Sequence, residues 1–270
     1  MPPLKEIHYF DKRQLARSKN PFYRSHLRKR MRRYGRFKTY RKALTPGNSG
    51  FLRNLSWDAH FFLGRRDNDW YRGVFRPRPG QIAGEITPAY STMKVKVVEE
   101  IHGINPDLRI IYLLRDPIER SWSSALMTLS KRGGRPVESI TDDELMNHFD
   151  KAGHTLRSDY VRTLDNWEGV FGREQIFVGF LDEIQNDPRG LLLRVYRFLG
   201  VAADEAHIPA GVSARVNTSP RERSVIPEQY RSHLARMYLP QLQELSERFG
   251  EPATDWLRRA EETISSSPSA

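Results

Sequence analysis

The strongest chemical feature of this 270-residue sequence is an arginine between an apolar run and the start of a helix. The run before Arg115 is rich in Ile and Leu, which predicts a buried parallel strand. Asp116 and Pro117 then resemble a helix N-cap and a proline at the first helical position. Free N–H groups and the helix dipole at such a turn favour an anion, and Ser121 and Ser123 add hydroxyls. The spacing predicts an anion site, with an ordinary solvated arginine as the alternative.

The residues from Leu114 to Ser123 follow the pattern Leu-Arg-Asp-Pro-x-x-Arg-x-x-Ser. This pattern resembles the 3′-phosphate-binding segment of sulfotransferases that use 3′-phosphoadenosine 5′-phosphosulfate (PAPS), especially the heparan-sulfate-type and related bacterial enzymes. The resemblance implies that Arg115 and Ser123 hold the 3′-phosphate of the donor. It also implies an α/β fold of the P-loop kinase-like type, with helices flanking a parallel sheet.

A segment near the start of the chain, Glu-Ile-His-Tyr-Phe-Asp, resembles the family's Glu-x-His-Phe-Phe-Asp, which carries the proposed catalytic base. The resemblance implies that Glu6 is the general base, with His8 as a second catalytic residue two positions further on. A base of this kind takes the proton of the acceptor hydroxyl or amine during sulfuryl transfer. An exposed carboxylate and a hydrogen-bonded core histidine are the alternative interpretations of these two side chains.

A second segment, Glu-Ile-Thr-Pro-Ala-Tyr, resembles the family's Glu-Lys-(Ser/Thr)-Pro-x-Tyr beside the active site. It implies that Glu85, Thr87 and Tyr90 bind substrate, whereas simple packing around a fixed turn is the alternative. Ile86 stands where the heparan-type enzymes often have a lysine. Further along, Tyr160 and a loop that contains Arg221 are expected to close over the nucleotide. The resemblance extends over residues 4–257.

The family's sequences open with a strand and a Lys-x-Gly-Thr-Thr loop that cradles the 5′-phosphosulfate, and this chain has no such pattern. We expect that loop to lie upstream of Met1. We therefore also expect residues 1–270 alone to be poorly soluble and to transfer little sulfate. The alternative function is a non-catalytic protein that retains only the 3′-phosphate site.

The net charge of +11 points to an anionic partner. Between Arg24 and Lys42 there are ten Lys or Arg residues, no acid and several aromatic side chains. This stretch is interpreted as a solvated surface, a surface for an anionic acceptor such as a carbohydrate, or, least favoured, a nucleic-acid-binding segment. The chain has no cysteine and no zinc-protease motif, so we expect no metal, and no apolar run suggests a membrane span. A cytoplasmic location is expected.

Strand patterns alternate with helix patterns, which favours one α/β domain over residues 1–257 and a disordered tail over residues 258–270. Thr141 and Glu144 predict a capping box that opens a short helix. The predicted strands cover residues 7–10, 81–86, 108–114 and 176–181. The predicted helices cover residues 56–63, 92–102, 117–131, 160–171, 188–199 and 227–249.

Overall fold

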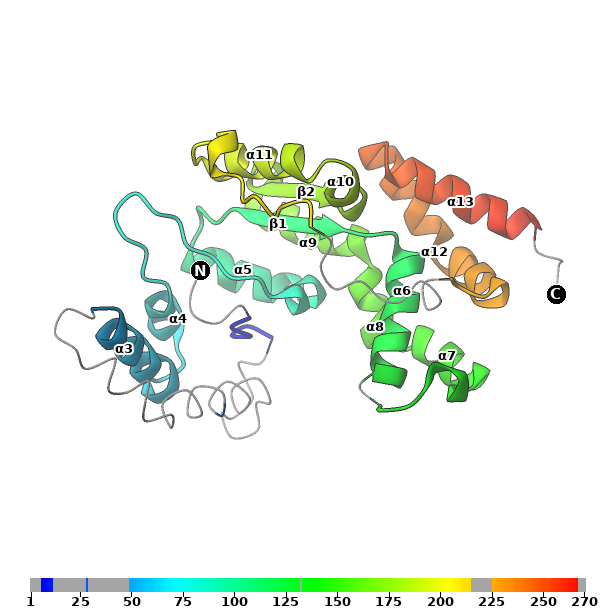
Figure 1. Ribbon diagram of the computed structural model, residues 1–270, viewed down its shortest axis with the longest axis horizontal. Coiled ribbons are helices and arrows are strands. Elements are labelled where there is room, and N and C mark those ends of the chain that lie inside the picture. Colours follow the sequence, from blue (N-terminus) through cyan, green and yellow to red (C-terminus); the bar gives the residue numbers. More distant parts are fainter. Residues whose placement is uncertain (1–5, 12–27, 29–48, 132, 215–224, 267–270) are drawn as a thin grey trace. The chain divides into compact units, whose positions relative to one another are not determined.

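The computed structural model describes residues 6–11, 28, 49–131, 133–214 and 225–266 (Figure 1). The chain divides into two compact units, residues 1–93 and 94–270, and a single domain over residues 1–257 stays a prediction. Arg221 and nearly all of the basic stretch lie outside the described residues.

The helices and strands are α3 Ser49–Leu63, α4 Asn68–Val74, α5 Val95–Ile104, β1 Ile110–Leu114, α6 Pro117–Ala125, α7 Asp142–Phe149, α8 Ala152–Ser158, α9 Tyr160–Phe171, β2 Ile176–Phe180, α10 Leu181–Asn186, α11 Pro188–Leu199, α12 Glu228–Phe249 and α13 Ala253–Ser266. Shorter turns of 3₁₀ or π helix are Pro88–Thr92, Leu126–Lys131, Val137–Ser139, Arg173–Gln175 and Glu205–His207.

In the first unit, aromatic side chains hold α3 and α4 together. Trp57 stacks on Phe61 with ring centroids 4.9 Å apart, and Phe61 lies 5.3 Å from Trp70. The Trp57 indole donates to the Val74 carbonyl at 2.9 Å, and the Trp70 indole donates to the His60 carbonyl at 3.0 Å. These buried rings therefore pack without leaving their N–H groups unpaired.

In the second unit, β1 and β2 form a parallel pair in which Ile110 faces Ile176 and Leu114 faces Phe180. Helices α9 and α11 both contact β2, and Figure 1 shows them on opposite sides of the two strands. This arrangement confirms the α/β class. The expectation that β1 is buried holds for Leu114, at 1% exposed, and is wrong for Ile111 and Leu113, at 38% and 48% exposed.

The C-terminal helices supply much of the core of the second unit. Helices α12 and α13 pack on each other, and α12 also contacts α6. Trp256 of α13 is fully buried, with its ring centroid 5.6 Å from that of Phe180 at the end of β2. The predicted disordered tail over residues 258–270 is therefore wrong as far as Ser266, since α13 continues to that residue.

Several predicted helices are confirmed closely, including α9, α11 and the capping box of α7, in which Thr141 and Glu144 bond to each other's backbone. The helix predicted over residues 117–131 ends as α6 at Ala125 and continues as a π-helical segment. Two predicted strands, residues 7–10 and 81–86, are not strands. In the first, His8 has a left-handed φ of +52°, which interrupts an extended chain.

Within the described residues, no helix combines the length and apolarity that crossing a bilayer requires. The same part of the chain contains no group of three or more His, Cys, Asp or Glu side chains placed to hold a metal ion.

We predict that α13 stabilises the second unit through Trp256. Trp256→Ala removes a fully buried indole and should lower the free energy of unfolding by about 3–5 kcal/mol, as large-to-small core changes do. Urea denaturation measures the loss, and Glu261→Ala on an exposed position of the same helix is the control. Equal stability of the Trp256 variant and the wild type would contradict this packing role.

Candidate active site

In the first unit, His8 lies between two carboxylates. Its Nε2 atom is 2.9 Å from Glu6 Oε2, and its Nδ1 atom is 2.8 Å from Asp11 Oδ2. His8 is 3% exposed, whereas the Glu6 side chain is 36% exposed. Since carboxylates only accept hydrogen bonds, both contacts are made when both ring nitrogens carry protons. The imidazole therefore orients Glu6 and leaves part of that carboxylate open to solvent.

The backbone around His8 is held by the second segment singled out in the sequence. Glu85 Oε2 accepts from the Ile7 amide at 3.2 Å, and the Tyr90 hydroxyl accepts from the Tyr9 amide at 3.1 Å. These two bonds flank the left-handed residue, in the segment where the sequence predicted a strand. Glu85 is thus a support for the Glu6 segment in the described structure.

Glu85 also gathers three hydroxyl groups. Its Oε1 atom accepts from Tyr71 at 2.6 Å and Tyr90 at 3.1 Å, and its Oε2 atom accepts from Thr87 at 2.6 Å. Burial first, and the nearby Glu85 carboxylate second, raise the pKa of both tyrosines well above the ordinary value. These phenols stay protonated and keep donating. Substrate binding by Glu85, Thr87 and Tyr90 stays a prediction.

In the second unit, Arg115 follows the last residue of β1. Its backbone carbonyl accepts a hydrogen bond from the Tyr160 hydroxyl at 2.8 Å. Tyr160 is 3% exposed, and a nucleotide contact by its side chain stays a prediction. The Arg115 side chain is 37% exposed, and its Nη2 atom lies 3.4 Å from Glu119 Oε2. The guanidinium is therefore reachable by a ligand.

The start of α6 differs from the sequence prediction of free N–H groups. Asp116 Oδ1 accepts from the amides of Ile118 at 2.8 Å and Glu119 at 3.4 Å, and the Asp116 carbonyl accepts from Arg120. Pro117 has no amide proton to offer. The expectation of free backbone amides at this turn is therefore wrong, and anion binding by Arg115 and Ser123 stays a prediction.

The two candidate serines have different environments. Ser121 is fully buried, and its hydroxyl is 2.8 Å from that of Tyr238, so it does not serve an external anion. Ser123 is half-buried, and among the described contacts its hydroxyl has no partner. It lies four residues after Glu119, on the same face of α6, and Glu119 is the partner of Arg115. This spacing places Ser123 and Glu119, the partner of Arg115, one helical turn apart.

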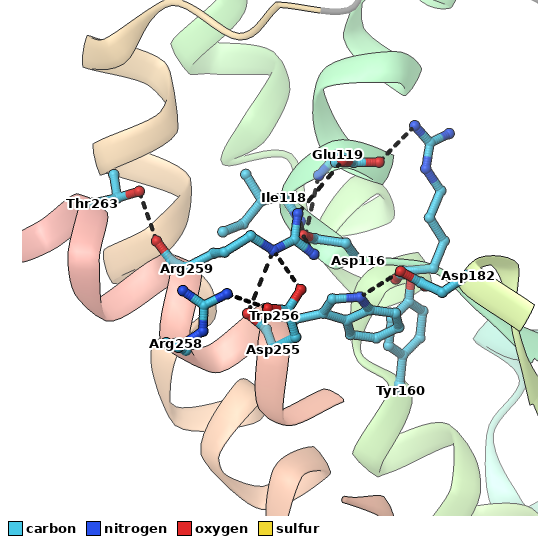
Figure 2. A network of polar contacts seen from close by, with 11 residues as sticks. Asp116, Ile118, Glu119, Tyr160, Asp182, Asp255, Trp256, Arg258, Arg259 and Thr263 are labelled. Atoms are coloured by element: carbon cyan, nitrogen blue, oxygen red, sulfur yellow. Dashed lines mark hydrogen bonds and ion pairs between the residues drawn. The ribbon is translucent and has the colours of Figure 1, made fainter. Parts of the chain in front are cut away.

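Asp116 is itself a buried carboxylate, at 6% exposed. Its burial is the main reason that the pKa rises from 3.8 to about 6, although the Arg259 guanidinium opposes the rise. Figure 2 shows Arg259, from α13, reaching the turn between β1 and α6.

Sequence reasoning missed the role of Asp11 and the whole contribution of Arg259. Asp11 belongs to the resembling segment, and its spacing of three residues from His8 was an available signal. Nothing in the sequence marks Arg259 for this contact, because Asp116 and Glu119, its partners at the turn, are far away along the chain.

The fold agrees with a solved structure. The crystal structure of a sulfotransferase from Alicyclobacillus acidocaldarius superposes with a TM-score of 0.59, covering 94% of this chain and 87% of that one at 21% identity. At this identity the likeness establishes the fold alone.

The sequence then defines the family. The sequence model of the sulfotransferase family matches residues 3–205, and the chain belongs to that family. Heparan sulfate glucosamine 3-O-sulfotransferase 6 of Mus musculus is 33% identical over 155 residues, which are 56% of this chain and 45% of the relative. Heparan sulfate glucosamine 3-O-sulfotransferase 3B1 of Homo sapiens is 31% identical over 156 residues, 56% of this chain and 40% of the relative. The match thus spans less than half of the length of these curated relatives.

The pKa of Asp116 predicts a pH-dependent contribution to stability. Because the folded-state pKa of about 6 exceeds the ordinary 3.8, this contribution is complete below pH 3.8 and is lost as the pH rises through 6. Asp116→Asn keeps a capping side chain but cannot ionise. The wild-type free energy of unfolding, minus that of the variant, should therefore fall between about pH 4 and about pH 7. Urea titrations at several pH values measure it, and a constant difference would contradict the assignment.

Proposed function

We propose that this protein is a PAPS-dependent sulfotransferase that moves a sulfuryl group to a hydroxyl or amine of its acceptor. The observation that carries the proposal is the strand–helix turn, where the Arg115 side chain is 37% exposed and the Ser123 hydroxyl, eight residues further on in α6, has no partner among the described contacts. We assign the 3′-phosphate of the donor to these two side chains. Tyr160 fixes the backbone of Arg115, and a nucleotide contact from Arg221 stays a prediction.

We assign proton removal to Glu6. The acceptor oxygen or nitrogen attacks the sulfur of PAPS while the bond from sulfur to the 5′-phosphate oxygen breaks, and adenosine 3′,5′-bisphosphate leaves with that electron pair. The acceptor proton passes to the Glu6 carboxylate. His8 keeps this carboxylate oriented, and Asp11 keeps the imidazole oriented. This division of roles is supported by the exposure of Glu6 and the burial of His8.

A carbohydrate hydroxyl is the acceptor that we favour. Support comes from the names of the relatives, heparan sulfate glucosamine 3-O-sulfotransferases, and from the net charge of +11, which suits an anionic acceptor. Ile86 stands where such enzymes often have lysine, which argues for a different acceptor contact at that position. The described residues give no support for nucleic-acid binding, for a non-catalytic role or for a cytoplasmic location.

The phosphate assignment predicts a large loss of affinity in Arg115→Ala. A charged hydrogen bond contributes roughly 1.5–3 kcal/mol, so adenosine 3′,5′-bisphosphate should bind about 10- to 150-fold more weakly in calorimetric titrations. Arg109→Ala is the matched control, because Arg109 lies at the opposite end of the same strand. Unchanged affinity in a folded Arg115→Ala protein would refute the assignment. Binding of oligonucleotides instead, falling steeply with added salt, would favour the nucleic-acid alternative.

The base assignment predicts that Glu6→Gln lowers turnover by ~10²-fold or more while donor binding is retained, since the amide cannot accept the proton. Turnover is measured with PAPS and a heparan-type oligosaccharide. Asp69→Asn, an exposed carboxylate in the same unit, should leave the rate unchanged. Near-normal turnover of Glu6→Gln would instead make Glu6 a structural partner of His8.

A further inference from the structure

A polar cavity of about 250 Å³ lies beside the strand–helix turn in the second unit, lined among others by Arg115, Asp116, Glu119, Asp182, Asp255 and Arg259. Four of these six side chains are acidic and two are basic. The cavity therefore does not itself suit a phosphate. Its charges instead act on Arg115, whose guanidinium belongs to both the cavity wall and the proposed phosphate site.

Arg259 contacts the acidic side chains of the turn from α13, as Figure 2 shows. Its Nη2 atom is 3.4 Å from Asp116 Oδ2, and its Nη1 atom is 3.9 Å from Glu119 Oε1. On its own helix, Asp255 Oδ2 lies 3.1 Å from Arg259 Nε and holds the guanidinium in this direction. Arg259 is thus oriented toward the turn by a carboxylate one helical turn earlier.

Glu119 is shared between two arginines. One carboxylate oxygen faces Arg259, and the other lies 3.4 Å from Arg115 Nη2. A phosphate that binds Arg115 has to compete with this carboxylate, because both ligands are anions for the same guanidinium. Arg259 offsets the charges of Glu119 and Asp116 and so weakens that competition. Without Arg259, Glu119 would have Arg115 as its remaining guanidinium partner among the described contacts.

We propose that Arg259 is a positioning residue for phosphate binding by Arg115, acting through Glu119 and Asp116. This inference rests on the proposed function, since it takes the 3′-phosphate site at Arg115 as given. It assigns a role in donor binding to α13, which lies outside the region matched by the family model.

The test compares two ligands, adenosine 3′,5′-bisphosphate and adenosine 5′-monophosphate, by calorimetry on the full chain. Arg259→Gln should weaken the bisphosphate about two- to fivefold, the range of a half-exposed ion pair, and leave the monophosphate unchanged. Arg259→Lys retains the charge and should restore most of the affinity, and it also serves if the glutamine variant does not fold. Arg258→Gln is the matched control, because Arg258 pairs only with Asp255 and Glu262 of its own helix in the described contacts.

Three results would overturn the inference. These are wild-type bisphosphate affinity in Arg259→Gln, an equal loss for both ligands, and an equal loss in Arg258→Gln. Arg115→Ala, measured in parallel, distinguishes a failure of the positioning role of Arg259 from a failure of the phosphate site. If Arg115→Ala weakens the bisphosphate and the Arg259 variants do not, only the positioning role fails. If Arg115→Ala has no effect, the phosphate site itself is wrong and the inference falls with it.

Discussion

A buried carboxylate at the turn between β1 and α6 constrains the whole second unit. Asp116 is 6% exposed, and a buried charge is costly unless it is paired and hydrogen-bonded. One of its oxygens caps α6 and the other faces Arg259, so both are satisfied. That second contact requires α13 to lie against the turn, which places Trp256 against the end of β2. The pairing of the Asp116 carboxylate at the turn and the packing of α13 on the end of β2 therefore depend on each other.

In the first unit, the Glu85 carboxylate is stabilised by uncharged hydrogen-bond donors. Glu85 accepts hydrogen bonds from three hydroxyls and one backbone amide, and no described arginine or lysine is needed to pair with it. Hydrogen bonds to the charged form stabilise a carboxylate much as a counter-ion does. The result is a rigid support for the segment of Glu6 and His8. These two carboxylates are thus held by different means, since Asp116 pairs with an arginine and Glu85 accepts from hydroxyls.

The sequence predicted elements whose signals are local. The helix at residues 160–171 and the capping box at Thr141 follow from spacing and from capping chemistry, and the structure contains both. The strand at Ile110–Leu114 was also predictable, but the exposure of Leu113 depends on what lies next to β1 and has no local signal. The same limit explains the failed strand at residues 7–10, because the left-handed His8 is stabilised by Glu85 and Tyr90 from far along the chain.

The position of α13 has a practical consequence for the residue range that is chosen for expression of this protein. A boundary drawn from the family match would stop at residue 205 and remove both C-terminal helices. Such a fragment would keep Arg115, Ser123 and every motif that identifies the family. It would also expose the end of β2 to water and leave Asp116 as a lone charge in a partly apolar setting. The region defined by shared sequence thus leaves out a helix that packs against the candidate phosphate site.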